Sequence, residues 1–366
     1  ILGQYSDMWF SSPLAGFIVT ALFSTSTTPG KNNIKNNDVS TMINLQDLLS
    51  TCVDACGRGC EEIRNVQSKR IGDGVDTLKV EFKDPLDAKS ALTEADGAAQ
   101  RVICNALLHT WGSGLKIIGE EDDDENSDDN VAPEEYLELS RDLLSYDDDV
   151  DIPTARLQDI TIYVDPLDGT REFVESRLRS CQTLVGIAVN GKAVAGAMGV
   201  PFPAGDLTQP PSIVHGLVGV GAGMLGETPT PVYDNSDNEA TGPLLATGDG
   251  PMDVMVAARE VVTKGFGGKN LLYGGAGNKI LATAFGQVDC TIQHKFGGPW
   301  DTCAPEAVIK AMGGTITDLF GEPISVYTEG KRNAFGFVAT SKSTKIEHAA
   351  LCAALAAAPS IQEYRT

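Results

Sequence analysis

The segment DITIYVDPLDGT, residues 159–170, constrains the fold more than any other part of the sequence. Isoleucine and valine alternate with other residues along its first half, which is typical of a β-strand. Pro166 and Gly169 end that alternation and predict a tight turn. The sequence therefore predicts a strand that delivers Asp165 and Asp168 to a sharp bend.

Asp165 and Asp168 can converge on one point only if the backbone turns sharply, and Gly169 permits such a turn. The same turn leaves the carbonyl group of Leu167 free to point to that centre. Hard divalent cations such as Mg²⁺ prefer this mixture of carboxylate, carbonyl and water oxygens. A metal site is one interpretation of the motif, and an ordinary turn after a strand is the other.

Two further carboxylates lie at the ends of predicted elements. Glu120 follows the short apolar strand LKIIG, and Asp301 precedes a predicted helix over residues 304–312. A carboxylate at the start of a helix is stabilised as the anion. Three acidic positions at element ends favour a multi-metal centre for phosphoryl transfer over three unrelated turns.

Hydrophobic periodicity predicts the other elements. It indicates long helices over residues 40–66 and 92–111, with Ser40 and Thr41 as caps of the first helix. Asn190-Gly191 predicts a β-hairpin between two β-rich segments. Strand and helix candidates alternate along the last third of the chain. The N-terminal half is therefore predicted to be α+β, and the C-terminal half layered α/β.

Composition divides the chain into three parts. Residues 1–37 contain an apolar run too short for a stable membrane span, and they are predicted to be a targeting remnant or a disordered leader. A cytoplasmic and an organellar location both stay open. Residues 38–240 form the predicted metal-binding half, in which 122–151 is an acidic insertion that faces water, with calcium binding as the alternative. Residues 241–366 form the C-terminal half.

The charge of the chain limits its partners. It carries 28 Lys and Arg residues against 50 Asp and Glu residues, a net charge of −22, which disfavours nucleic acid polymers. A small phosphorylated substrate is compatible with this charge if bound cations reverse the local field. The eight cysteines are not expected to form a disulfide scaffold, because the chain can bury a large core. The four histidines adjoin none of the acidic motifs and are predicted to be structural or surface residues.

Two other phosphate-handling motifs fit less well. The nucleophile motif of haloacid-dehalogenase phosphatases also has an Asp pair, but one residue separates the two, whereas Asp165 and Asp168 are separated by two. This difference in spacing argues against a phosphorylated aspartate intermediate and for direct attack of water on the phosphate. The segment GFGGKN, residues 265–270, lacks the Ser or Thr that completes a P-loop.

Five motifs in order along the chain carry a family resemblance: TEAD, IIGEED, VDPLDGT, GGAGNKI and WDTCAPE. Together they resemble the lithium-sensitive, magnesium-dependent phosphatases of the inositol monophosphatase family. Within that family the chain is most similar to the 3′(2′),5′-bisphosphate nucleotidases. The resemblance covers roughly residues 40–350. It implies the αβαβα sugar-phosphatase fold, with the active site between the two halves.

The resemblance also implies roles for individual residues. It implies two or three Mg²⁺ ions, inhibition by Li⁺, and metal ligands at Glu120, Asp165, the Leu167 carbonyl, Asp168 and Asp301. Asp96 and Thr170 match the pair that activates the attacking water. GGAGNKI opens a predicted helix whose N–H groups can face a sugar or a second phosphate. Within and near it, the resemblance implies substrate-binding residues at Gly275, Lys279 and Thr247.

One segment departs from the family pattern. The nucleotidases carry a Thr-Arg-Ser-His-like segment where this chain has ATGDG, residues 246–250, and only Thr247 is kept. The expected reaction is removal of the 3′-phosphate from 3′-phosphoadenosine 5′-phosphate or its sulfated relative. The alternatives are an inositol polyphosphate 1-phosphatase, a family member that binds metal or anions without turnover, and an acidic structural protein.

Overall fold

The computed structural model describes residues 40–72, 78–82, 91–121, 138–147, 149–233, 241–294, 297–324, 327 and 335–365. The leader predicted at 1–37 and most of the predicted insertion at 122–151 lie outside the described residues. Within the described ranges, no helix combines the length and the apolar character that crossing a membrane requires.

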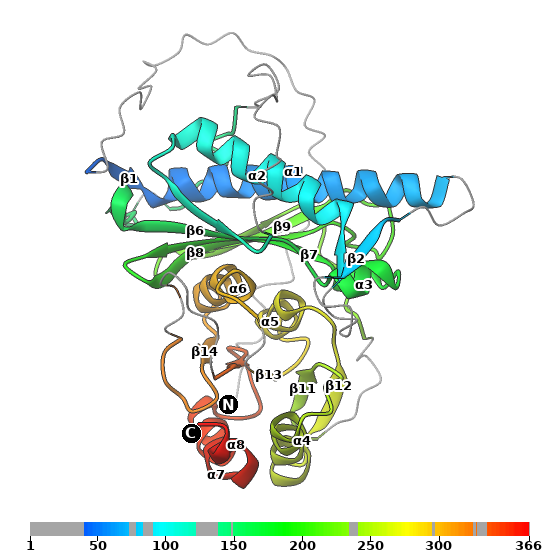
Figure 1. Cartoon of the computed structure of the whole chain (residues 1–366). Coiled ribbons are helices and arrows are strands. Elements are labelled where there is room, and N and C mark those ends of the chain that lie inside the picture. Colours follow the sequence, from blue (N-terminus) through cyan, green and yellow to red (C-terminus); the bar gives the residue numbers. More distant parts are fainter. Residues whose placement is uncertain are drawn as a thin grey trace, which may run out of the picture. The chain divides into compact units, whose positions relative to one another are not determined.

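Helices and strands alternate along the chain (Figure 1). The α-helices are α1 (Leu45–Gly72), α2 (Glu94–Trp111), α3 (Thr170–Val174), α4 (Asp253–Glu260), α5 (Ala276–Ala284), α6 (Trp300–Ala311), α7 (His348–Ala357) and α8 (Pro359–Glu363). Shorter helical turns are η3 (Leu157–Asp159), η4 (Leu178–Ser180) and the π-helical η5 (Val261–Gly265). The strands are β1 (Met42–Asn44), β2 (Val80–Phe82), β3 (Ala91–Thr93), β4 (Lys116–Gly119), β5 (Thr154–Arg156), β6 (Ile160–Asp168), β7 (Gln182–Val189), β8 (Lys192–Val200), β9 (Ser212–Leu217), β10 (Gly221–Leu225), β11 (Leu244–Thr247), β12 (Lys269–Leu272), β13 (Cys290–Gln293), β14 (Thr315–Thr317) and β15 (Phe337–Thr340).

The first large sheet has six strands in the order β10-β9-β8-β7-β6-β4. All neighbours are antiparallel except β4, which runs parallel to β6. Helices α1 and α2 pack on one face of this sheet, and α6 packs on the other. The predicted hairpin joins β7 to β8 through Asn190 (φ 50°) and Gly191 (φ 73°). The α+β prediction for this half is confirmed.

The second sheet has five strands in the order β12-β11-β13-β15-β14, and β11 is parallel to both of its neighbours. Residues of α5 and α6 pack with β14 and β15 on one side of it. Residues of α4, α7 and α8 pack with β11, β13 and β15 on the other side. The layers therefore follow the order helix, sheet, helix, sheet, helix (Figure 1), which confirms the predicted αβαβα fold.

A row of glycines lets α6 approach the first sheet closely. Gly186 on β7, Gly196 on β8 and Gly216 on β9 are paired in register across the three strands. A Cβ atom at Gly196 would lie 2.5 Å from the Cα atom of Ala304 in α6. Cβ atoms at the other two positions would lie 2.6 and 2.7 Å from atoms of the same helix. Only glycine fits under α6 along this row.

The start of α1 differs from the prediction. The helix begins at Leu45, and the side-chain oxygen of Asn44 accepts hydrogen bonds from the N–H groups of Gln46 and Asp47. The residues before it form β1, which pairs with β5 more than 100 residues later in the chain. The predicted start at Ser40 is therefore wrong, because pairing with a distant strand overrides local helix signals.

His215 gives this fold a specific pH dependence. It lies on β9, is 6% exposed, and has the Tyr146 hydroxyl 3.4 Å from its Nδ1 atom. Burial lowers the pKa of His215 from 6.5 to about 4. Between these two values the unfolded chain binds more protons than the folded one. The free energy of unfolding should therefore fall as pH drops through this window, by up to about 3 kcal/mol from this group.

Urea unfolding of the native protein and of His215→Gln at about pH 7 and about pH 4.5 measures this effect. We expect the native protein to lose stability relative to the variant at the lower pH. The contributions of all other titrating groups cancel in that comparison. A stability difference that does not change with pH would contradict the assignment.

Candidate metal centre

Strand β6 brings two carboxylates to one turn. Its pairing with β7 shifts register between Asp165 and Asp168, so the backbone bends where the sequence predicts a turn. The N–H group of Leu167 donates to Oδ1 of Asp165 over 3.1 Å, which closes the turn. Gly169 follows with φ 89°, and a Cβ atom there would lie 2.7 Å from the carbonyl oxygen of Ser180. Glycine is therefore required at this position.

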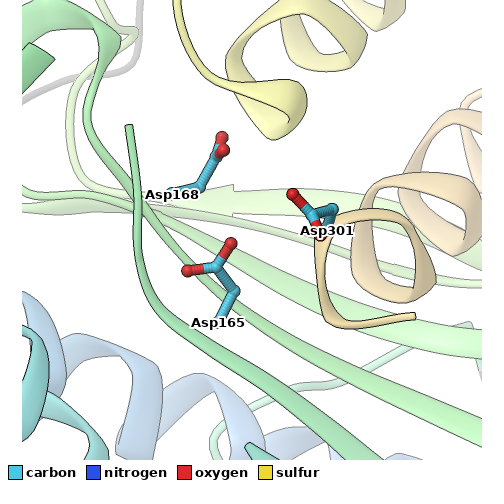
Figure 2. Close-up of side chains that lie close together, drawn as sticks. All are labelled: Asp165, Asp168 and Asp301. Atoms are coloured by element: carbon cyan, nitrogen blue, oxygen red, sulfur yellow. The ribbon is translucent and has the colours of Figure 1, made fainter. Parts of the chain in front are cut away.

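The carboxylates of Asp165, Asp168 and Asp301 form a cluster. One oxygen of each lies within 4.8 Å of the others, and the described residues contain no other such group of three or more His, Cys, Asp or Glu side chains. Figure 2 shows the three side chains converging from β6 and from the start of α6. The structure thus brings together three of the five predicted metal ligands by their side chains.

Glu120 joins this cluster from the neighbouring strand. Its N–H group donates to the carbonyl of Val164 over 2.9 Å, which continues the parallel pairing of β4 and β6. The negative charge of its side chain is one of the causes that raise the pKa of Asp165. Because the carboxyl ends of parallel neighbours lie at the same edge of a sheet, Glu120 and Asp165 reach the same point.

The N-terminus of α5 holds Asp168. The N–H groups of Ala276 and Gly277 donate to its two carboxylate oxygens over 2.8 and 2.7 Å. Helix N-termini favour anions in this way. The prediction that the N–H groups of this segment face a sugar or second phosphate is therefore wrong for these two residues. Their role as partners of Asp168 has no local signal in the sequence, because more than 100 residues lie between them.

Asp301 is the second residue of α6, which begins at Trp300, four residues before the predicted start at 304. The carboxylate therefore lies within the first turn of the helix rather than before it. The N–H group of Gly298 donates to its Oδ2 atom over 2.5 Å. This bond fixes the side chain toward β6 rather than toward solvent (Figure 2).

The electrostatics of the cluster favour a cation. Burial raises the pKa of Asp165 well above its usual value, and the charges of Glu120, Asp168 and Asp301 raise it further. Burial and the charges of Glu120 and Asp168 also raise the pKa of Asp301 well above its usual value. Burial raises the pKa of Asp168, although Lys279 and the two α5 N–H groups oppose the rise. Carboxylates packed so closely repel one another unless a positive charge lies among them. An all-oxygen donor set of this kind fits Mg²⁺.

Asp96 and Thr170 form a hydrogen-bonded chain beside the cluster. The Thr170 hydroxyl lies 3.0 Å from both Oδ1 of Asp96 and the carbonyl oxygen of Leu167. Thr93 caps α2, and its N–H and hydroxyl groups donate to Oδ2 of Asp96 over 2.8 and 2.6 Å. Burial raises the pKa of Asp96 to about 7, although the bonds from Thr93 oppose the rise. The capping box Thr93-x-x-Asp96 is visible in the sequence, and it is the signal by which Thr93 could have been found.

The three predicted substrate-binding residues lie in different surroundings. Gly275 precedes α5 with φ 71°, and a Cβ atom there would lie 2.8 Å from Oδ2 of Asp168. Lys279 is 5% exposed, and its Nζ atom donates to the carbonyl of Gly275 over 2.5 Å. Thr247 ends β11, and its hydroxyl donates to Asn270 over 2.8 Å. Gly275 and Lys279 therefore adjoin the acidic cluster, whereas the side chain of Thr247 is bonded within the second sheet.

The sequence is similar to those of known proteins. The model of the inositol monophosphatase family matches residues 44–360. Human 3′(2′),5′-bisphosphate nucleotidase 1 is 31% identical over 262 residues, which are 69% of this chain and 79% of that protein. The Dictyostelium discoideum protein of the same name is 29% identical over 82% of this chain and 95% of its own length.

A solved structure supports the fold. The IMPase of Thermotoga maritima superposes with a TM-score of 0.59 over 87% of this chain and 99% of that one, at 19% identity. The family match spans every residue of the acidic cluster. The chain belongs to the inositol monophosphatase family.

Proposed function

We propose that this chain is a Mg²⁺-dependent phosphomonoesterase that removes the 3′-phosphate of 3′-phosphoadenosine 5′-phosphate, or of its sulfated relative, by direct attack of water. The observation that carries the proposal is the carboxylate cluster of Asp165, Asp168 and Asp301 beside the Asp96 and Thr170 pair. The names of the relatives indicate the reaction, since they are called bisphosphate nucleotidases.

The metal ligands we propose are Glu120, Asp165, the Leu167 carbonyl, Asp168 and Asp301. When bound, Mg²⁺ supplies Lewis acidity that lowers the pKa of water and neutralises phosphate charge. Hydrogen bonds within the protein hold the carboxylate oxygens of Asp301 and Asp168 in position. Gly298 does this for Asp301, and the α5 N–H groups do it for Asp168. The resemblance implies two or three such ions and inhibition by Li⁺.

Asp96 is the proposed general base, and Thr170 relays the proton to it. A water that donates to the Thr170 hydroxyl oxygen lets that hydroxyl donate in turn to Oδ1 of Asp96, which is 3.0 Å away. The capping bonds from Thr93 leave this oxygen as the one that faces Thr170. A base whose pKa lies near 7 is matched to work near neutral pH.

The substrate side of the proposal rests on Gly275, Lys279 and Thr247. Gly275 and Lys279 adjoin Asp168 and are proposed to contact the nucleotide. The departure at residues 246–250 concerns substrate choice and leaves the proposed metal ligands unchanged. An inositol polyphosphate 1-phosphatase would share those ligands, but the relatives reported above carry nucleotidase names.

A phosphate-release panel tests the proposal. We expect Mg²⁺-dependent release from 3′-phosphoadenosine 5′-phosphate, loss of release when EDTA removes the metal, and inhibition by added Li⁺. Release from inositol 1,4-bisphosphate at a comparable or higher kcat/KM would support the inositol alternative instead. Failure to release phosphate from either substrate would indicate a binding protein without turnover.

A further inference from the structure

Strands β11, β12 and β13 of the second sheet run parallel, so their carboxyl ends lie at the same edge of the sheet. The segment after β12 leads to α5, which holds Asp168, and the segment after β13 leads to Asp301. Ligands of such sheets bind at the carboxyl ends of the strands. The turn after β11, residues 248–250, therefore lies at the same edge as the acidic cluster.

Hydrogen bonds from Arg259 hold the turn on both sides of Asp249. The guanidinium group of Arg259 in α4 donates to the carbonyl of Gly248 over 3.2 Å and to that of Gly250 over 2.9 Å. These bonds fix the backbone on each side of Asp249. Its carboxylate extends from the turn, and Oδ2 lies 2.9 Å from Nη1 of Arg171.

Arg171 is the second residue of α3 and directly follows Thr170. Its Nε atom donates to Glu175 one turn later over 2.9 Å, so two carboxylates share one guanidinium group. Arg171 is 30% exposed and Asp249 is 48% exposed, so solvent and solutes reach the pair. A guanidinium group binds phosphate oxygens in the same two-pronged way as a carboxylate.

From this arrangement we propose that Arg171 recognises the second phosphate of the substrate, and that Asp249 is a specificity-determining residue that competes with that phosphate for Arg171. The inference rests on the proposed function, because it assigns a subsite of the same reaction. Asp249 comes from the C-terminal half and Arg171 from the N-terminal half, so the pair spans the two elements between which a nucleotide would lie.

The competition has a direction. Arg171 is bonded to both Asp249 and Glu175, but Glu175 is also paired with Arg177. A second phosphate that approaches Nη1 of Arg171 therefore has to displace Asp249, whereas a substrate with one phosphate does not need to displace it. Because the side chains of Arg171 and Asp249 are partly exposed, we expect Asp249 to raise KM for the bisphosphate by a modest factor and not to prevent its binding.

The test compares phosphate release from 3′-phosphoadenosine 5′-phosphate with release from 3′-AMP, which has the same scissile group and no second phosphate. For Asp249→Asn we expect KM for the bisphosphate to fall about 3- to 10-fold with kcat unchanged. For Arg171→Gln we expect the same KM to rise about 10-fold. Neither variant should change KM for 3′-AMP by more than about 2-fold.

The double variant Arg171→Gln/Asp249→Asn should have the KM of Arg171→Gln alone, because Asp249 acts only through Arg171. Glu260→Gln is the matched control, since Glu260 is an exposed carboxylate paired with Lys264 within its own helical segment. If the wild type releases phosphate and the variants change both substrates alike, the inference is wrong and the pair is structural. If the wild type releases phosphate from neither substrate, the proposed function itself has failed.

Discussion

Replacing Asp168 by Asn is expected to lower kcat/KM for Mg²⁺-dependent phosphate release on the order of 10³-fold. The substitution removes one charge from the carboxylate cluster. It also places an amide donor against one of the two α5 N–H groups that Asp168 accepts, since Ala276 and Gly277 each donate to a separate oxygen. The substitution therefore removes the negative charge of residue 168 and also disturbs the position of its side chain. Steady-state phosphate release with excess Mg²⁺ measures the effect.

Asp206→Asn is the control for this change, because it makes the same substitution at an exposed residue between β8 and β9. Its rate should stay within about 2-fold of the native rate. Thermal melting with and without Mg²⁺ supplies a second measurement. A ligand that binds the folded state raises the melting temperature, so Mg²⁺ should stabilise the native protein more than Asp168→Asn. A variant with native turnover and a native response to Mg²⁺ would remove Asp168 from the metal centre.

The carboxylate cluster could be predicted from the sequence because each member lies at the end of a locally coded element. The alternation before Asp165 specifies a strand, and the apolar run before Glu120 specifies its neighbour. The helix after Asp301 has a clear pattern of its own. The rules for sheets and helix starts then bring such ends together. The family resemblance added the pairing of Asp96 with Thr170, which spacing alone does not give.

The interactions that hold the cluster in place could not be predicted in this way. Asp168 is bonded to Ala276 and Gly277, which lie more than 100 residues away and contribute only backbone groups. Ser40 offers a local cap, which predicts a start of α1 at that residue. In the structure Met42–Asn44 pair with β5 instead, and Asn44 caps the helix. In both cases contacts distant in sequence decide the outcome.

The row of glycines under α6 (Gly186, Gly196 and Gly216) also depends on contacts between residues distant in sequence. A substitution in this row is expected to have a large effect on stability. Gly196→Ala is expected to lower the free energy of unfolding by about 2–3 kcal/mol. The new Cβ atom would lie 2.5 Å from the Cα atom of Ala304, whereas ordinary contacts begin at 3.4 Å. The helix or the strand must therefore move by about 0.9 Å, since the obstruction is backbone that has no alternative rotamer.

The same movement should reach the active site. Helix α6 carries Asp301 in its first turn, so a shift near 1 Å separates this carboxylate from Asp165 and Asp168. Displacements of this size cost on the order of 10²-fold in rate. Gly265→Ala is the matched control, because a Cβ atom at Gly265 has no neighbour within 4 Å. Urea unfolding and phosphate release, measured on both variants, test the argument. If Gly196→Ala kept native stability and rate, close approach of α6 to the sheet would not be what positions Asp301.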